Sequence, residues 1–209
     1  MQITHEISVV LLSYMIGCIS TGYYLTRFFA GKDIRNYGSG STGARNVGRI
    51  LGKKGFIVTM CGDFAKGMIA MAIVNTFQFS AWAVVLSLLG VVLGHIYPLQ
   101  LGFRGGKGIA VTLGALLVFD WHLVAALAMF FALYFVLSKK YMLSGMLGIM
   151  MLPFIAVLMG YSTVEITGIV ILTFIILFAH RTNICKLIPA IHTTTEATSS
   201  GNNNTHGKG

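Results

Sequence analysis

Charged side chains are scarce in this sequence. Asp, Glu, Lys and Arg make up 10% of the 209 residues, whereas 56% are hydrophobic and fall in long blocks. A soluble domain carries more charge than this, so the composition argues against one and predicts a multi-pass membrane protein. Acidic residues are the scarcest, at 6 against 15 Lys and Arg. In a membrane protein an excess of Lys and Arg over acidic residues first reflects the orientation of the chain in the membrane, and only second an anionic partner.

Cysteine is also rare, and its positions argue against the common metal and disulfide patterns. Cys18, Cys61 and Cys185 lie far apart, in or beside apolar segments, without CxxC spacing. We therefore expect small buried side chains and no metal site. The Gly-x-x-x-x-Gly-Lys-Ser/Thr pattern is missing, so ATP binding is not supported. No histidine is followed five residues later by aspartate, which separates the chain from the acyltransferases that carry this signature.

The long apolar blocks predict an all-α polytopic membrane protein with seven transmembrane helices, its N-terminus outside and its C-terminus cytoplasmic. We expect residues 1–187 to form one transmembrane domain. Residues 188–209 are rich in Thr, Ser, Asn and Gly, so they are expected to be a disordered cytoplasmic tail. The expected spans are Ile7–Phe29, Gly55–Phe77, Ala81–Leu101, Gly108–Phe119, His122–Leu137, Met142–Gly160 and Val164–Ala179.

Lys and Arg collect at alternate ends of these spans, and the other ends have neither. The basic segments are Lys32–Lys54, Arg104–Lys107, Lys139–Lys140 and Arg181–Lys208. One helix over Gly108–Leu137 would place Lys139 and Lys140 outside, so the positive-inside rule favours two helices with a turn at Asp120. A helix of about 12 residues rises only about 18 Å, so the first of the two must be sheltered by neighbours or begin inside the membrane.

A glycine-rich, basic loop is expected over Gly38–Arg49. Glycine lets backbone N–H groups approach a ligand closely, and arginine beside them suits a phosphate. The alternative is a flexible, solvated loop whose arginines only set topology. The candidate ligand-binding residues of this loop are Gly38, Ser39, Gly40, Ser41, Arg45, Asn46 and Arg49.

A second glycine-rich loop, Gly102–Gly108, directly precedes an apolar helix. Glycines and Lys107 before a helix start resemble an anion site at a helix N-terminus, where free N–H groups and the dipole favour negative charge. The alternative is a cationic turn that sets topology. The candidate binding residues are Arg104, Gly105, Gly106 and Lys107, with His95 just upstream. For His95 alone, a structural hydrogen-bonding role is favoured.

Two further constellations involve charge near the helix ends or interiors. His180 and Asn183 are three residues apart at the end of the last span, and a histidine near neutral pKa can exchange a proton there. An interfacial His-Arg pair that only closes the span is the alternative. Asp63 and Lys66 lie inside the second span, where a lone charge costs about 2.5–3.5 kcal/mol. A structural ion pair is favoured over a proton or ion pathway.

Several of these motifs, in this order, resemble one family: the bacterial membrane glycerol-3-phosphate acyltransferases that use acyl phosphate as donor. The likeness covers the chain from the first span to about Leu187. The motifs are Gly-Ser-Gly at 38–40 with Asn46 and Arg49, Asp63 with Lys66-Gly67, Leu93–Pro98, Gly105–Gly108, and His180-Arg181 with Asn183-Ile184. The family is similar in its seven spans and cytoplasmic-face active site.

The resemblance implies transfer of a fatty acyl group from acyl phosphate to the 1-hydroxyl of glycerol 3-phosphate. The products would be lysophosphatidic acid and phosphate, made for phospholipid biosynthesis at the bacterial plasma membrane. The implied catalytic residues are Ser39, Arg49, Lys107, His180 and Asn183. The implied partners are the two substrates and membrane lipid, with no cofactor and no nucleic acid. The acyl chain would lie between spans, open to the lipid.

The chain departs from the family pattern at a few positions. Ser41 stands where the family usually has Asn, Arg45 where it has Thr, and Leu143 where it has Ser. Ala179 and Thr182 replace Arg and Glu around the last histidine. These changes leave open a diverged paralogue that binds or regulates lipid precursors without catalysis. Asp63, Lys66 and the intramembrane glycines leave a second alternative, a small transporter of an organic phosphate or ion.

Overall fold

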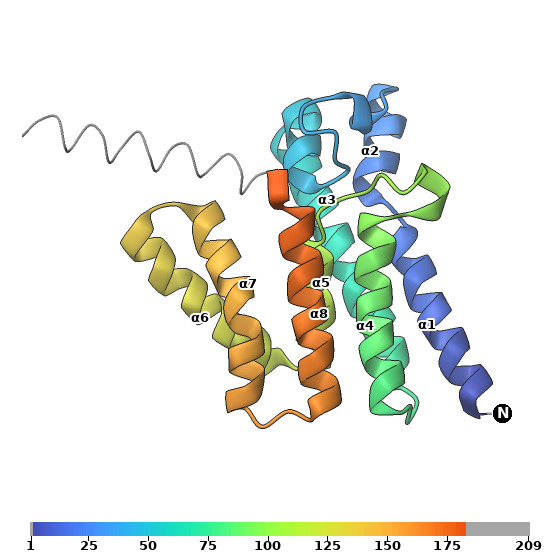
Figure 1. Cartoon of the computed structure of the whole chain (residues 1–209). Coiled ribbons are helices and arrows are strands. Elements are labelled where there is room, and N and C mark those ends of the chain that lie inside the picture. Colours follow the sequence, from blue (N-terminus) through green and yellow to red (C-terminus); the bar gives the residue numbers. More distant parts are fainter. Residues whose placement is uncertain (1, 183–209) are drawn as a thin grey trace, which may run out of the picture.

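The computed structural model describes residues 2–182, which form eight α-helices and two 3₁₀ turns without any strand. The helices run side by side as one bundle (Figure 1). Their bounds are α1 (Gln2–Cys18), α2 (Thr21–Ala30), α3 (Ala44–Asn75), α4 (Ala81–Ile96), α5 (Ile109–Phe119), α6 (Trp121–Ser138), α7 (Tyr141–Leu158) and α8 (Thr163–Ala179), with the turns η1 (Ile34–Asn36) and η2 (Leu99–Leu101). The predicted all-α class is therefore confirmed over the described residues.

The first predicted span, Ile7–Phe29, is not one continuous helix. It breaks after Cys18, and α2 begins at Thr21 after an extended Ser20. The break leaves backbone carbonyls without helical partners, and side chains from elsewhere satisfy them. Gln100 donates its side-chain N–H to the carbonyl of Cys18, and Lys66 donates to those of Gly17 and Ile19. Hydropathy could not reveal this break because its partners are distant in sequence.

The helix of the second predicted span starts earlier than expected. α3 begins at Ala44, so half of the predicted Gly38–Arg49 loop is helical. Gly52 interrupts the helix with φ 67° and ψ −163°, a conformation open mainly to glycine. The short piece 44–51 therefore runs in its own direction, separate from the apolar piece 53–75. This kink allows Arg45, Asn46 and Arg49 to sit on a helix without entering the apolar span.

The chain reverses at Asp120, so the stretch Gly108–Leu137 forms two helices, as the charge pattern predicted. The Asp120 side chain accepts a hydrogen bond from the backbone N–H of His122 at 2.8 Å and caps α6. α5 has 11 residues and rises only about 17 Å. Its residues Val111, Gly114 and Leu116 are buried against neighbouring helices. The predicted shelter is therefore present.

The basic connections lie at one end of the bundle. The α2–α3 and α4–α5 connections, the α6–α7 turn and the end of α8 are all at the top of Figure 1, opposite the N-terminus. Within residues 2–182, five stretches are long and apolar enough to cross a membrane, and two shorter apolar helices, α5 and α8, accompany them. This arrangement has the charge separation that the sequence pattern indicated.

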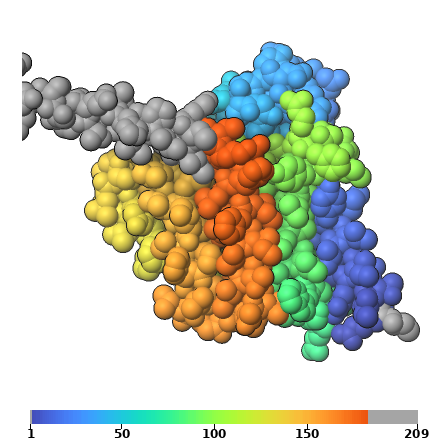
Figure 2. Space-filling view, in the orientation of Figure 1, coloured from blue at the N-terminus to red at the C-terminus, as the bar shows by residue number. Residues whose placement is uncertain are grey.

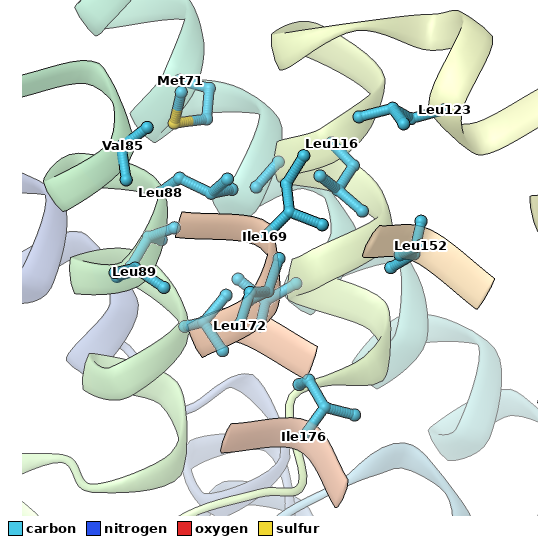
Figure 3. Close-up of a cluster of buried hydrophobic side chains, with 14 of the residues drawn as sticks. Met71, Val85, Leu88, Leu89, Leu116, Leu123, Leu152, Ile169, Leu172 and Ile176 are labelled. Carbon is cyan, nitrogen blue, oxygen red and sulfur yellow. The ribbon is translucent and has the colours of Figure 1, made fainter. Parts of the chain in front are cut away.

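The apolar core gathers around α4 and α8. α4 packs against α1, α3, α5 and α8, and α8 lies between α4 and α7 (Figures 1 and 2). Leu88 from α4, Leu116 from α5 and Leu172 from α8 are almost fully buried in the same cluster (Figure 3). At the cavity end of this core, Gly108 lies against Ile176, so the α5 N-terminus and the α8 C-terminus are beside one another.

The two cysteines in the described part of the chain differ in burial. Cys18 is buried at the end of α1, as expected, whereas Cys61 on α3 is exposed. The expectation of a small buried side chain is therefore wrong for Cys61. An apolar residue on a membrane helix can face lipid, a cavity or the protein core. Hydropathy alone therefore could not tell the buried Cys18 from the exposed Cys61.

Glycines bring α3 and α5 into close contact. A Cβ at Gly67 would collide with the carbonyl oxygen of Val111, and one at Gly114 would collide with that of Phe64. Small residues at such crossings allow backbones to approach closely, which favours helix association in membranes. The crossing therefore holds the apolar piece of α3 directly against α5.

Candidate active site

A cavity of about 790 Å³ opens between α3, α5, α6 and α7 at the basic end of the bundle. Its polar lining combines the three sequence regions that were predicted to carry the chemistry. The polar lining residues are Ser39, Ser41, Arg45, Asn46, Arg49, Asp63, His95, Lys107, Tyr141 and His180. Helices and loops that are distant in sequence therefore contribute to one site.

Asn46 organises the first loop. Its side-chain oxygen accepts from the backbone N–H of Ser39 at 3.1 Å. Its amide nitrogen faces the carbonyl oxygens of Tyr37 and Ser41, both at 2.9 Å, and of Ile34 at 3.3 Å. Asn46 is 2% exposed. These contacts occupy the side-chain amide of Asn46. The geometry therefore indicates that Asn46 holds the loop in place and does not indicate that it binds a ligand directly.

The loop conformation also needs glycine beside this asparagine. Gly38 has φ 57°, and a Cβ there would collide with the side-chain oxygen of Asn46. With the loop held this way, the hydroxyls of Ser39 and Ser41 lie 3.2 Å apart in the cavity lining. Both can donate to an anion.

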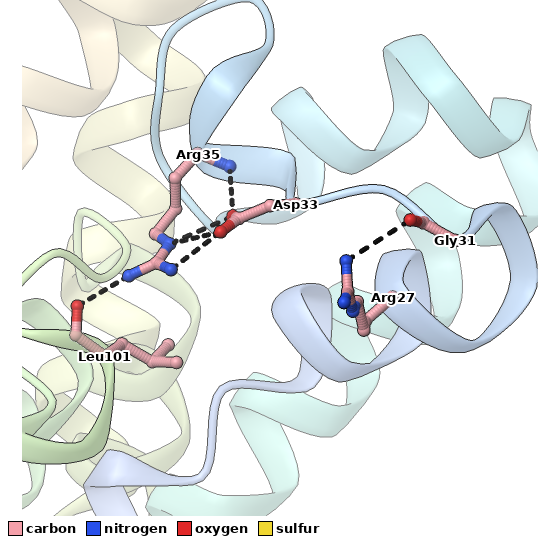
Figure 4. A network of polar contacts seen from close by, with 5 residues as sticks. All are labelled: Arg27, Gly31, Asp33, Arg35 and Leu101. Carbon is pink, nitrogen blue, oxygen red and sulfur yellow. Dashed lines mark hydrogen bonds and ion pairs between the residues drawn. The ribbon is translucent and has the colours of Figure 1, made fainter.

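The two glycine-rich loops are fastened together. The backbone N–H of Thr42 donates to the carbonyl of Gly105 at 3.2 Å. Arg35 donates to the carbonyl of Leu101 at 2.7 Å while its guanidinium is held by Asp33 (Figure 4). The hydrogen bond from Arg35 holds the pKa of Asp33 below its usual value, although burial opposes the shift. The two regions are thus joined by one backbone hydrogen bond and by the bond from Arg35, whose guanidinium is fixed by its ion pair with Asp33.

The second loop packs directly on His95. The N–H of Gly106 donates to the carbonyl of His95 at 3.0 Å, and that of Gly105 donates to the carbonyl of Ile96 at 3.1 Å. A Cβ at Gly106 would collide with the imidazole of His95. Close approach therefore explains the glycines at 105 and 106, which do not line the cavity themselves. The loop turns Lys107 into the cavity lining.

Positive charge dominates the polar half of the cavity. Arg45, Arg49 and Lys107 line it, and Asp63, the carboxylate among the lining residues, is paired with Lys66 at 3.2 Å. The N-termini of α3 and α5 also reach the cavity, through Gly43–Arg45 and Gly108–Ala110. The first N–H groups of a helix lack helical partners and favour an anion. This half of the cavity is therefore suited to phosphate groups.

His180 ends α8 at the cavity and is 7% exposed. Its Nδ1 lies 2.9 Å from the carbonyl oxygen of Ile176, which can only accept, so Nδ1 carries the proton and Nε2 keeps its lone pair. Burial lowers the pKa of His180, the bond to Ile176 opposes this, and the positive charge of Lys107 lowers the pKa further. The neutral ring can then accept a proton through Nε2.

The other half of the cavity is apolar. Phe56, Met60 and Phe64 recur every four residues along α3 and line one wall, a periodicity that the sequence analysis did not use. The remaining apolar lining comes from α5, α6 and α7 through Ile109, Ala110, Leu113, Phe131, Met142 and Met146. Phe56, Met60 and Phe131 of this lining are exposed side chains of the bundle.

Not every candidate residue reaches the cavity. Arg104 is exposed and outside its lining, and Gly38, Gly40, Gly105 and Gly106 act through backbone shape. Asn183 lies outside the described residues, as do Cys185 and the expected polar tail. The site residues that line the cavity are Ser39, Ser41, Arg45, Asn46, Arg49, His95, Lys107 and His180.

Tyr141 is a lining residue that the sequence analysis missed. Its ring lies 5.1 Å from the guanidinium carbon of Arg45, a cation–π contact that joins α7 to α3 across the cavity. Ser144 is fully buried, bonds to the carbonyl of Lys140 and is not part of the lining. It therefore does not replace the hydroxyl that the family carries at position 143.

Asp63 and Lys66 form the predicted structural ion pair. The carboxylate and ammonium groups are 3.2 Å apart, and both side chains are at most 6% exposed. Lys66 also lies 2.8 Å from Nδ1 of His95. The favoured structural role of His95 is consistent with this contact.

Comparison with known proteins identifies the family. The family model described as glycerol-3-phosphate acyltransferase matches residues 7–190. The chain belongs to this family. Among curated glycerol-3-phosphate acyltransferases, one from Desulfitobacterium hafniense is 43% identical over 183 residues, covering 88% of this chain and 91% of the relative. One from Bacillus cereus (strain ATCC 10987) is 39% identical over 169 residues, covering 81% and 93%.

Solved structures of this family match the fold. The crystal structure of PlsY (YgiH), an integral membrane glycerol 3-phosphate acyltransferase in its glycerol 3-phosphate form, aligns with a TM-score of 0.81 and 30% identity over 89% of this chain and 93% of that one. Its lysophosphatidic acid form aligns with a TM-score of 0.78 and 28% identity. This glycerol-3-phosphate acyltransferase family member is therefore a multi-pass integral membrane protein.

Proposed function

We propose that the chain transfers a fatty acyl group from acyl phosphate to the 1-hydroxyl of glycerol 3-phosphate, releasing lysophosphatidic acid and phosphate. Family membership supports glycerol-3-phosphate acyl transfer itself. The observation that carries the proposal is the cavity, which joins a cationic half suited to phosphates with an apolar half. The choice of acyl phosphate as donor follows the family resemblance. An acyl phosphate and glycerol 3-phosphate present two phosphates and one acyl chain, which matches that division.

The phosphate groups would lie against Arg49, Lys107 and the N-termini of α3 and α5. Bringing two anions together needs compensating positive charge, and ionised donors form the stronger hydrogen bonds. Ser39 and Ser41 would add hydroxyl donors at the same end. Asn183 is proposed as a further donor from the resemblance alone. Arg45 would either contact phosphate or stay on the ring of Tyr141.

The acyl chain would lie in the apolar half, along Phe56, Met60 and Phe64. A fatty acyl chain comes from the bilayer, which is as apolar as this lining, so the cavity would position the chain and would gain little transfer free energy. Because this half opens on the surface of the bundle, the product could leave sideways into the bilayer.

The chemistry needs little from the protein because the acyl group is already activated. The 1-hydroxyl oxygen attacks the carbonyl carbon, the bond from this carbon to the phosphate oxygen breaks, and phosphate leaves with that electron pair. The hydroxyl proton goes to Nε2 of His180 or to the departing phosphate. Lys107 and Arg49 would stabilise the negative charge that develops, and the cavity would hold the two substrates together.

We further propose seven membrane crossings, with the N-terminus outside and the site at the cytoplasmic face of the bacterial plasma membrane. The grouping of basic connections at the cavity end supports this orientation under the positive-inside rule. In this topology α1 and α2 together make the first crossing.

A donor comparison tests the proposal. Purified protein in lipid nanodiscs is supplied with glycerol 3-phosphate and acyl phosphate, acyl-CoA or acyl-carrier protein, and lysophosphatidic acid and phosphate are measured. Of the three donors, we expect only acyl phosphate to support turnover. In Lys107→Ala we expect the turnover rate to fall at least about a hundredfold, in line with removal of one charge-stabilising donor. Turnover with acyl-CoA in place of acyl phosphate would refute the donor assignment.

The same assay decides the non-catalytic alternative. If Ser41, Arg45, Leu143 and Thr182 mark a protein that only binds lipid precursors, the unaltered chain is inactive with every donor. The combined substitutions Ser41→Asn, Arg45→Thr, Leu143→Ser and Thr182→Glu, which restore the family pattern, would then create turnover. Activity in the unaltered chain rejects this alternative.

A further inference from the structure

The ammonium of Lys66 joins two distant parts of the fold. It lies 3.0 Å from the carbonyl oxygen of Gly17 and 2.6 Å from that of Ile19, at the break between α1 and α2. It also lies 2.8 Å from Nδ1 of His95, beneath the second glycine-rich loop. Its ion pair with Asp63 therefore accounts for only part of its surroundings.

The donors and acceptors around Lys66 fix the form of His95. A lysine ammonium has three N–H donors and no acceptor, and the two carbonyls can only accept. Nδ1 of His95 is closer to Lys66 than Asp63 is, at 2.8 Å against 3.2 Å, and it lies 3.6 Å from the carboxylate. Nδ1 must therefore accept from Lys66, which leaves the ring proton on Nε2.

Nε2 faces the loop that leads to Lys107. A Cβ added to Gly106 would collide with this nitrogen, and the backbone of Gly106 is itself bonded to the carbonyl of His95. His95 also lines the cavity and is 4% exposed. The Nε2–H form thus sets the ring directly against the backbone of Gly106, one residue before Lys107.

We propose that Lys66 is a positioning residue for the acyl transfer. It acts through His95, by holding the imidazole as the Nε2–H tautomer under the 105–108 loop, while its other two bonds secure the break in the first span. This assignment rests on the proposed function, because the loop matters through the phosphate it would bind. Asp63 supplies the opposite charge that allows an ammonium to remain buried.

The test reads the tautomer and the turnover separately. Side-chain ¹⁵N-labelled histidine reports which ring nitrogen of His95 carries the proton, with His95→Gln used to assign the signals. In Lys66→Met we expect a mixture of tautomers. We also expect kcat/KM for glycerol 3-phosphate to fall about ten- to hundredfold, the loss seen when partners that orient metal-binding histidines are removed.

Lys53→Met is the matched control, because Lys53 is an exposed lysine on the same helix and outside the cavity lining. It should leave both readouts unchanged. If Lys66→Met does not fold, the variant Asp63→Asn with Lys66→Met removes both charges and should show the same tautomer mixture.

Folded Lys66 variants that keep His95 fully in the Nε2–H form overturn the proposal, whether or not turnover is lost. Mixed tautomers together with turnover equal to that of Lys53→Met overturn it as well. An unaltered protein that is inactive with acyl phosphate contradicts the proposed function instead, and the NMR comparison still decides whether Lys66 sets the histidine.

Discussion

Replacing Asn46 tests how the first loop is built. Its amide contacts four backbone groups, the N–H of Ser39 and the carbonyls of Ile34, Tyr37 and Ser41. Asn46→Ala removes all of them and leaves the loop without its central support. We expect both stability and activity to fall, and activity to fall further because the loop positions Ser39 and Ser41 in the cavity.

The magnitude follows from the contacts that are lost. A hydrogen bond contributes about 1 kcal/mol net, and water can reach part of this loop to replace some of them, so unfolding should be easier by about 1–3 kcal/mol. The effect on rate is larger, since misplacing a catalytic group by about 1 Å can cost about a hundredfold. We therefore expect kcat/KM for glycerol 3-phosphate to fall about a hundredfold.

The assay is phosphate release with acyl phosphate, run beside thermal unfolding in the same detergent. Asn75→Ala is the matched control: Asn75 is on the same helix, is exposed, and makes one side-chain bond, to the carbonyl of Val118 at 3.1 Å. It should lower stability slightly and leave kcat/KM within about threefold, the range of a surface substitution. Asn46→Ala with the activity of this control would refute the loop argument.

Two further predictions concern the histidine and the helix crossing. With neutral His180 as proton acceptor, kcat/KM should be constant at neutral pH and fall on acidification below about pH 6.5. The reason is that the lowered pKa of His180 moves protonation of Nε2 to more acidic pH. A pH profile in which His180→Ala still shows this acidic fall in kcat/KM would contradict the assignment. Gly67→Ala should lower the free energy of unfolding by about 1–3 kcal/mol through overpacking against Val111. Gly145→Ala meets nothing within 4 Å and serves as the control in the same thermal denaturation.

Much of the architecture follows from local sequence. Apolar length located the helical stretches, although it hid the break between α1 and α2 and the early start of α3. The alternation of basic ends predicted the turn at Asp120, where the structure has it. Glycine, serine and arginine in one segment indicated the loop that lines the cavity. These features depend on neighbouring residues, so a single sequence is enough to suggest them.

The remainder depends on contacts between distant residues. The break after Cys18 is stabilised by Lys66 and Gln100, and the role of Asn46 became clear only from its four backbone partners. The apolar half of the cavity needs α3, α6 and α7 to be brought together. The periodicity within one segment does not indicate which other segment it packs against. The spacing of Phe56, Met60 and Phe64 indicates only that these three side chains share one face of α3.

The central claim is that glycerol 3-phosphate binds in the cationic half of this cavity. An experimental structure of the protein with glycerol 3-phosphate bound tests it most directly. We predict density for the phosphate in contact with Arg49 and Lys107, between the N-termini of α3 and α5. Phosphate bound elsewhere on the bundle, with the cavity empty at saturating ligand, would contradict the account.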